Sequence, residues 1–145
     1  QNGILETLRG QGLEGSLRDK PIVLASGDSH SYGLLLVEGV LSAMGATVLN
    51  AGVDIAPAQL LDFADEKQVS DICVSVHNGQ ALTYGRQLVE LSGSRGRHYR
   101  FFMGGKLNGI LPGESEPREV DGLLRETGIL ATNDLAEMVR ALAER

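Results

Sequence analysis

Short apolar runs alternate with stretches of helical periodicity along most of this chain. Five runs have the length of buried strands and end at glycine or polar residues: 21–26, 46–50, 71–76, 99–103 and 129–132. Between the first two runs, Leu34, Val37, Leu41 and Met44 recur at helical spacing. The same periodicity predicts further helices over these segments: 57–67, 82–91 and 120–127, with a last one capped by Thr132 or Asn133.

This alternation of strand and helix predicts one α/β domain with a parallel sheet covered on both faces. Five strands with right-handed crossovers favour a flavodoxin-like (Rossmann-like), doubly wound sheet of order 2-1-3-4-5. We assign residues 21–145 to this domain and residues 1–20 to an N-terminal extension or linker, in which four glycines leave room for one short helical turn. In such sheets ligands bind beyond the carboxyl ends of the strands, between the first and third strands.

Composition narrows the functional classes. The 145 residues suffice for one domain with its own core, and a hydrophobic content of 42% excludes a disordered chain. A net charge of -6 argues against a nucleic-acid partner, which usually meets a basic face. No apolar run approaches the ~20 residues that span a bilayer, so no membrane partner is expected. One cysteine and no visible signal peptide favour a cytoplasmic setting.

One basic cluster leads into the fourth predicted strand and contains Arg95, Arg97, His98 and Arg100. We interpret it as a solvated loop, and the alternative is nonspecific contact with phosphate. His98 is expected to lie away from the ligand crevice because it comes before its strand rather than after it.

Three loops follow the ends of the first, third and fourth strands and should converge on one crevice. In the first, Asp28 either fixes the tautomer of a metal-binding His30 or caps the following helix. In the second, the Ser75 hydroxyl bonds either to local backbone or to a buried heterocycle. In the third, Gly104 and Gly105 form either a simple turn or a place where a ligand lies against the backbone.

Other nucleotide and phosphate sites fit these loops poorly. Residues 27–33 match neither GxxxxGK[ST] nor GxGxxG, and a receiver-like module would need a phosphorylatable aspartate where Ser75 stands. The chain has three histidines and one cysteine, so a metal site made by protein alone would need His30 and His77 with a carboxylate. One histidine would suffice if a macrocycle supplied the remaining ligands.

The three loops together resemble the vitamin B12 (cobalamin)-binding domain family. That family reads Asp-x-His-x-x-Gly after its first strand, Ser-x-Leu after its third and Gly-Gly after its fourth. The first motif is matched in full by residues 28–33, the second by Ser75 but with His77 in place of leucine, and the third by Gly104 and Gly105. Within the family, the resemblance is closest to the small subunit of glutamate mutase and the C-terminal domain of methylmalonyl-CoA mutase.

The resemblance implies roles for individual residues. His30 would be the lower axial ligand of cobalt, with Asp28 as its hydrogen-bonded partner, while Ser75 would bond the benzimidazole of a nucleotide tail held between the first helix and the sheet. Contacts to the cofactor would come from all three loops and the fifth strand: Gly27, Asp28, Ser29, His30, Ser31, Tyr32, Gly33, Ser75, Val76, His77, Gly79, Gly104, Gly105, Lys106, Leu107, Asn108 and Thr132.

Two departures from the family pattern concern His77 and the end of the fifth strand. His77 is a harmless substitution, a hydrogen-bond donor or a competitor for cobalt. Thr132 stands within Ala-Thr-Asn where the family often has Pro-Gly-Thr.

The resemblance further implies a cobalamin-binding unit of an adenosylcobalamin-dependent carbon-skeleton mutase, an isomerase whose catalytic TIM barrel is a separate subunit or domain. No catalytic residue is assigned to this domain itself. The mutase is favoured over methyl carriers and sensors because these normally have a helical domain before the cobalamin-binding domain, whereas only about 20 glycine-broken residues precede Pro21 here. The mutase in turn implies adenosylcobalamin rather than methylcobalamin. The alternative is a corrinoid methyl carrier or a cobalamin-based sensor.

Overall fold

The computed structural model describes residues 2–29, 32–77, 79–105, 107–109 and 118–144. A five-stranded parallel sheet forms its centre, with strand order β2-β1-β3-β4-β7. The strands of this sheet have the following bounds: β1 Pro21–Ser26, β2 Thr47–Gly52, β3 Asp71–Val76, β4 Arg100–Gly105 and β7 Leu130–Ala131. The predicted order 2-1-3-4-5 is therefore confirmed, because β7 is the fifth strand of the sheet.

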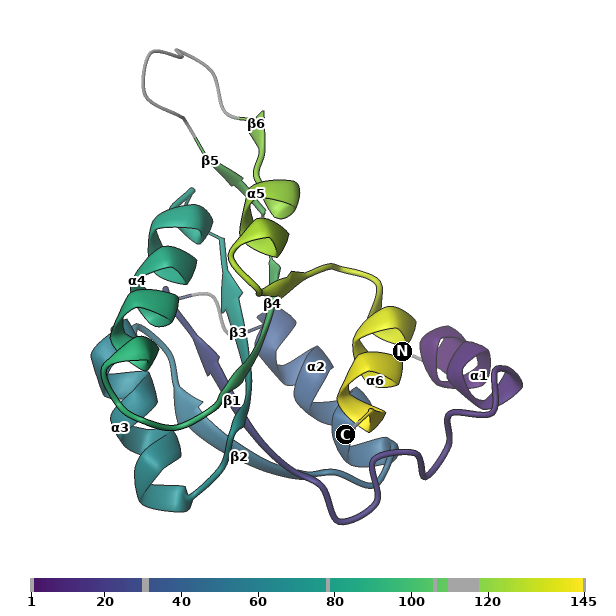
Figure 1. The fold of residues 1–145 in the computed structure, drawn as a ribbon. Helices are drawn as coiled ribbons and strands as arrows, with labels where there is room; N and C mark the ends of the chain where they lie inside the picture. The colour runs from purple at the N-terminus through teal and green to yellow at the C-terminus, as the bar shows by residue number, and fades with distance from the viewer. Residues whose placement is uncertain (1, 30–31, 78, 106, 110–117, 145) are drawn as a thin grey trace.

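Helices cover both faces of the sheet (Figure 1). Their bounds are α1 Asn2–Gly10, α2 Tyr32–Ala43, α3 Pro57–Lys67, α4 Ala81–Gly93, α5 Asp121–Glu126 and α6 Leu135–Ala143. One core joins α3, α4 and α5 to the sheet, and the other joins α1, α2 and α6 to its opposite face. No helix in the described ranges is long and apolar enough to cross a membrane.

The N-terminal segment contains more helix than the sequence predicts. Helix α1 has nine residues rather than one turn, and Leu8 and Leu17 are each only 1% exposed. The backbone N–H of Leu17 donates to the carbonyl of Met44, 3.0 Å away, at the end of α2. Burial of these leucines stabilises a helix whose glycines and short length make it weak in isolation.

Helix α6 begins one or two residues later than predicted, since the predicted N-cap was Asn133 or Thr132. Its N-cap is Asp134, whose carboxylate accepts hydrogen bonds from the backbone N–H groups of Ala136 and Glu137. Neither Thr132 nor Asn133 is the cap, because the Thr132 hydroxyl accepts from the Asp134 N–H and the Asn133 amide binds Gly105. All three adjacent residues are types that favour N-caps, and Asp134 is the one whose carboxylate accepts from N–H groups of the first turn.

Strand β4 runs through Gly104 and Gly105 instead of ending before them. Gly104 pairs with Ser75, and Gly105 pairs with Val76. A short antiparallel pair that the sequence did not predict follows, formed by β5 (Asn108–Gly109) and β6 (Arg118–Glu119).

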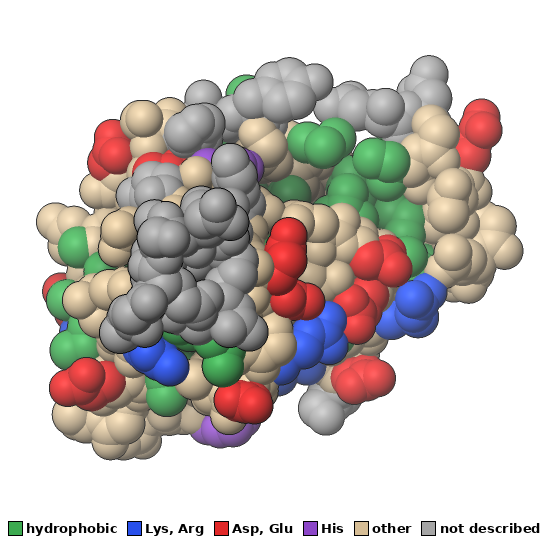
Figure 2. Space-filling model, turned by 90° about the horizontal axis from the view of Figure 1, so that it is seen from above, with side chains coloured by type: hydrophobic (Ala, Val, Ile, Leu, Met, Phe, Trp, Pro, Cys, Tyr) green, Lys and Arg blue, Asp and Glu red, His purple; other side chains and the backbone are tan. Residues whose placement is uncertain are grey.

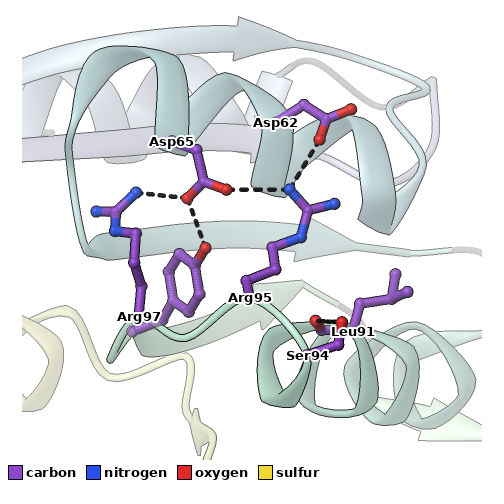
Figure 3. Close-up of polar contacts among 7 residues, drawn as sticks. Asp62, Asp65, Leu91, Ser94, Arg95 and Arg97 are labelled. Carbon is purple, nitrogen blue, oxygen red and sulfur yellow. Dashed lines mark hydrogen bonds and ion pairs between the residues drawn. The ribbon is translucent and has the colours of Figure 1, made fainter.

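The arginines of the basic cluster are paired with acidic side chains rather than solvated, as Figure 3 shows for Arg95 and Arg97, whereas His98 is exposed. Asp65 of α3 accepts bonds from Arg95, Arg97 and Tyr99. Arg100 makes a two-pronged ion pair with Asp71 at the start of β3. These arginines therefore fasten helix α3 and strand β3 at the edge opposite the carboxyl ends of the strands.

Candidate functional site

The ends of β1 and β3 are joined by a carboxylate. Asp28 follows β1, is 6% exposed, and accepts a 2.5 Å hydrogen bond at Oδ2 from the backbone N–H of His77, which follows β3. The Ser26 hydroxyl donates to the Asp28 carbonyl at 2.8 Å and lies 3.2 Å from its Oδ1. These hydrogen bonds connect the end of β1 with the end of β3. Asp28 therefore does more than cap the following helix, which was the alternative reading of this residue.

The loop after β2 supports the same residue. The Asp54 N–H donates to the Asp28 carbonyl at 3.0 Å, and the Ile55 N–H donates to the Ser26 carbonyl at 3.2 Å. Hydrogen bonds from the ends of β1, β2 and β3 therefore fix the backbone around Asp28 without a bound ligand.

Tyr84 of α4 holds this loop from the other face of the sheet. Its hydroxyl donates to the Ile55 carbonyl at 2.7 Å, and burial raises its pKa, so the phenol remains an O–H donor. A Cβ added to Gly27 would lie 2.8 Å from the Tyr84 ring. The absence of a side chain at position 27 thus leaves space for the Tyr84 ring.

A cavity of about 150 Å³ lies between helices α2 and α6 and the sheet. It opens at the carboxyl ends of the strands, the edge seen in Figure 2. Its apolar walls come from α2, α6 and the strands: Leu24, Leu34, Leu36, Val37, Leu135 and Met138. Its polar side chains are Ser75, His77, Thr132 and Asn133.

Alternate residues of β3 and its extension form one wall of the cavity. Cys73, Ser75 and His77 lie on the face that α2 and α6 cover, whereas Val74 and Val76 belong to the core on the opposite face. Burial raises the pKa of the Cys73 thiol, so this side chain is a small neutral part of the wall. The Ser75 hydroxyl lies 3.3 Å from Nδ1 of His77, so its described partner is a side chain and not local backbone.

Glycines form the sides of the cavity mouth. A Cβ on Gly33 would lie 3.7 Å from Cε1 of His77, and a Cβ on Gly104 would lie 3.4 Å from the Thr132 carbonyl and Asn133 Oδ1. Gly105 has φ +99°, and its Cβ would lie 2.5 Å from the Val76 carbonyl. Gly105 is therefore required by the fold itself, whereas Gly33 and Gly104 leave space at the mouth.

Asn133 is a site residue that the sequence analysis missed. Its amide nitrogen donates to the Gly105 carbonyl at 2.8 Å, and its Oδ1 accepts from the Gly105 N–H at 3.0 Å. The Asn133 side chain thus bonds the backbone of Gly105 just beyond the last residues of β4 and β7 that pair. The position directly after the predicted fifth strand was its only signal in the sequence. Leu135 and Met138 of α6 also line the cavity, and helical periodicity predicts only that they share one apolar face of the last helix.

The structure gathers part of the predicted site around the cavity: Gly33, Ser75, His77, Gly104, Gly105 and Thr132. Val76 and Leu107 pack instead in the core beneath α3 and α4, and Gly27 faces Tyr84 on the same side. Ser29 is exposed, Gly79 has φ +80° with open space around it, and the backbones of Tyr32 and Asn108 begin α2 and β5.

His30, Ser31 and Lys106 lie outside the described residues, so their predicted roles stay predictions. Among the residues that are described, no group of three histidine, cysteine or acidic side chains is placed to hold a metal ion.

The geometry defines a class of protein: a doubly wound domain with a cavity at the carboxyl edge of its sheet. The family model of the B12 binding domain matches residues 21–135. The chain therefore belongs to the B12-binding domain family. A comparison with proteins of curated description finds no match.

Solved structures of similar fold include proteins from Desulfitobacterium hafniense and Methanosarcina barkeri. A novel cobalamin-binding protein from Desulfitobacterium hafniense is 21% identical with a TM-score of 0.65, and the match covers 84% of this chain and 56% of that chain. The methanol:cobalamin methyltransferase complex of Methanosarcina barkeri is 15% identical with a TM-score of 0.62, covering 85% and 46%. The monomethylamine corrinoid protein of the same organism is 20% identical with a TM-score of 0.63, covering 96% and 63%. This chain thus spans about half to two thirds of the structures it resembles.

Proposed function

We propose that this domain binds cobalamin at the carboxyl edge of its sheet and presents it to a catalytic partner. The observation that carries the proposal is the cavity between α2, α6 and the sheet, which is lined by the motif residues Gly33, Ser75 and Gly104. In this proposal the cavity receives the nucleotide tail of the cofactor, and His30 binds cobalt from below. Residues 21–145 form the binding domain, and residues 1–20 lead into it.

The cavity fits the heterocycle of such a tail. Cavities of about 150 Å³ with aliphatic walls bind single aromatic rings in other proteins, and this cavity has that volume and such walls. The Ser75 hydroxyl supplies a polar group on the wall, and glycine backbone at Gly33 and Gly104 leaves room at the mouth. A flat heterocycle with one or two polar atoms suits this lining better than a sugar or a phosphate.

Different residues of the chain would orient the cobalt ligand and enclose the nucleotide tail. Asp28, fixed by hydrogen bonds from His77 and Ser26, would orient the His30 imidazole through its carboxylate. The apolar walls would exclude water from the tail. When bound, cobalamin supplies the cobalt–carbon bond, and the protein supplies position and environment.

A catalytic partner is supported by the surface beside the site. Leu35 in the first turn of α2 is 60% exposed, and Val53 directly after β2 is 42% exposed. Both lie near the carboxyl ends of β1 and β2, where a bound corrin would need a cover. We propose a TIM-barrel subunit or domain as that cover, in a cytoplasmic enzyme.

Two finer assignments remain as candidates. The motif resemblance supports an adenosylcobalamin-dependent mutase. A methyl carrier is supported by the likeness to the methanol:cobalamin methyltransferase complex and to the monomethylamine corrinoid protein.

Absorption spectroscopy tests the proposed function. Titration of the protein with adenosylcobalamin should shift the spectrum from the base-on to the base-off form with histidine bound, and His30→Ala should abolish this shift. His98→Ala is the matched control, since His98 is exposed and belongs to the loop before β4. An unchanged spectrum in the wild-type protein would overturn the proposal. Tighter binding of adenosylcobalamin than of methylcobalamin would favour the mutase candidate.

A further inference from the structure

Asn133 stands between the cavity and a second, wider opening beside it. This opening, the α1–α6 groove, has a volume of about 470 Å³ and is lined by Gly3, Ile4, Thr7, Leu8 and residues 133–136. Asn133 and Leu135 line both the groove and the inner cavity of about 150 Å³. The Asn133 side chain therefore lies where a ligand would pass from the groove into the cavity.

The two sides of this passage are joined by a side chain and not by a strand ladder. Pairing of β4 with β7 ends at Met103 and Ala131, and the Thr132 N–H donates to the Met103 carbonyl at 2.9 Å. One residue further on, the Asn133 amide donates to the Gly105 carbonyl at 2.8 Å and accepts from the Gly105 N–H at 3.0 Å. Rotation of one side chain releases both bonds, whereas a ladder would open only if the strands separated.

The residues around the amide are fixed, while Asn133 itself is exposed. Thr132 is 7% exposed, and its hydroxyl accepts from the N–H of Asp134, whose carboxylate caps α6. Because Asn133 is exposed, water replaces both of its hydrogen bonds when the amide turns away, so the cost of release is small. Exposed hydrogen bonds at the end of a short edge strand are among the parts of a protein that open most readily.

Gly104 provides the space over which the amide lies. A Cβ added to Gly104 would lie 3.4 Å from Oδ1 of Asn133 and 3.4 Å from the Thr132 carbonyl. Since glycine has no side chain, the Asn133 amide fills this place while it is bound to Gly105. The place becomes free when the amide turns away.

We propose that Asn133 is the gate of the cavity. While its amide is bound to Gly105, the cavity is closed toward the α1–α6 groove, and rotation of the side chain opens a path for a small flat ligand. The inference concerns the route into the cavity and not the identity of what binds there, so it goes beyond the proposed function and holds for the protein without cobalamin.

The thiol of Cys73 reports whether the gate is open, because it lines the cavity, is 2% exposed and belongs to the one cysteine of the chain. The cofactor-free chain is treated with methyl methanethiosulfonate, and mass spectrometry follows the rate of modification. Asn133→Ala should raise this rate about tenfold, which corresponds to a shift of about 1.4 kcal/mol in the opening equilibrium. Asn133→Asp fills the same space but cannot donate to the Gly105 carbonyl, and should also raise the rate.

Asn50→Ala is the matched control for these variants. Asn50 is an exposed asparagine that accepts a 2.8 Å hydrogen bond from the Gly52 N–H at the end of β2, and it does not line the cavity. Its replacement should leave the rate of Cys73 modification unchanged.

Urea separates opening of the gate from global unfolding. Opening of one side chain exposes little surface, so the faster modification of Asn133→Ala should depend only weakly on low concentrations of urea. A rate equal to that of the wild type, or an increase that follows the urea dependence of global unfolding, would overturn the inference. Either result would leave the proposed function standing, because that is judged by the spectral titration with adenosylcobalamin.

Discussion

The Asp28 carboxylate accepts a hydrogen bond from the backbone N–H of His77 and so connects two loops that lie 49 positions apart in the chain. The Ser26 hydroxyl contacts the same carboxylate from the end of β1. The ends of β1 and β3 are the two places where the family motifs of the cofactor site stand. One buried carboxylate therefore contributes to the fold and to the site together.

Asp28→Asn should destabilise the protein before any cofactor is added. The amide keeps one acceptor oxygen but turns an NH₂ group toward a donor, and the loss should be about 1–3 kcal/mol of unfolding free energy. Chemical denaturation of the cofactor-free protein measures it. Asp54→Asn is the matched control, because Asp54 is exposed and contributes its backbone N–H to this loop. Equal stability of the two variants would contradict the structural role of the carboxylate.

Gly27→Ala should force the loop away from Tyr84. The new methyl group would lie 2.8 Å from the aromatic ring, and overpacking of this kind costs about 1–3 kcal/mol. In a Tyr84→Leu background the ring is gone, so the added cost of Gly27→Ala should fall by half or more. Thermal unfolding of the four proteins gives the coupling between the two positions. Strictly additive losses would mean that the ring does not set the requirement for glycine.

The two adjacent glycines of β4 should respond differently to alanine. Gly105→Ala places a side chain at φ +99° and against the Val76 carbonyl, and should cost about 3 kcal/mol or more. Gly104→Ala meets its nearest atoms at 3.4 Å and should cost less than about 1 kcal/mol. Gly104→Ala should nevertheless weaken cobalamin binding in an absorption titration, because its methyl group narrows the mouth of the cavity. A Gly104 variant with unchanged affinity would exclude a close approach of the tail at this point.

The stability of the protein should depend on Asp65 in acid. Burial opposes ionisation of this carboxyl, but hydrogen bonds from Tyr99, Arg95 and Arg97 outweigh it and hold its pKa below the ordinary value of 3.8. A lowered pKa contributes stability above pH 3.8, and this contribution disappears as the pH falls through the folded-state value.

Asp65→Asn should therefore lose about 1–2 kcal/mol at pH 7, since the group is partly exposed and screened by solvent. The difference between variant and wild type should shrink as the pH falls below 3.8, as denaturation curves over a pH series would show. Asp62→Asn serves as the control, because Asp62 is more exposed and bonds Arg95 alone among the described residues. A loss that is the same at every pH would contradict the assignment to ionised Asp65.

The order of strands and most helix positions follow from the sequence for local reasons. Apolar runs of six residues such as 71–76 are buried on both faces, and their ends are marked by glycine or polar residues. Pro57 fixes the first turn of α3, and the bond from Ala56 N–H to the Gln59 side chain completes that start. Because parallel strands end at one edge, the sequence also predicted where the motif residues would meet.

The same local patterns could not decide contacts between distant segments. The acidic partners of Arg95 and Arg97 lie about 30 positions earlier, so the charge of the loop alone suggested a solvated cluster. The helix at residues 2–10 depends on burial of Leu8 against α2 and α6, which no propensity within that segment reveals.

The sequence by itself determined the parallel sheet, its strand order and the motif residues at its carboxyl edge, because these depend on hydrophobic periodicity and on short-range turn chemistry. Only the tertiary structure decided that α6 closes the cavity together with α2, that Asn133 binds Gly105, and that His77 faces Ser75. Each of these is a contact whose geometry depends on how helices pack on the sheet, and packing is a property of the whole chain.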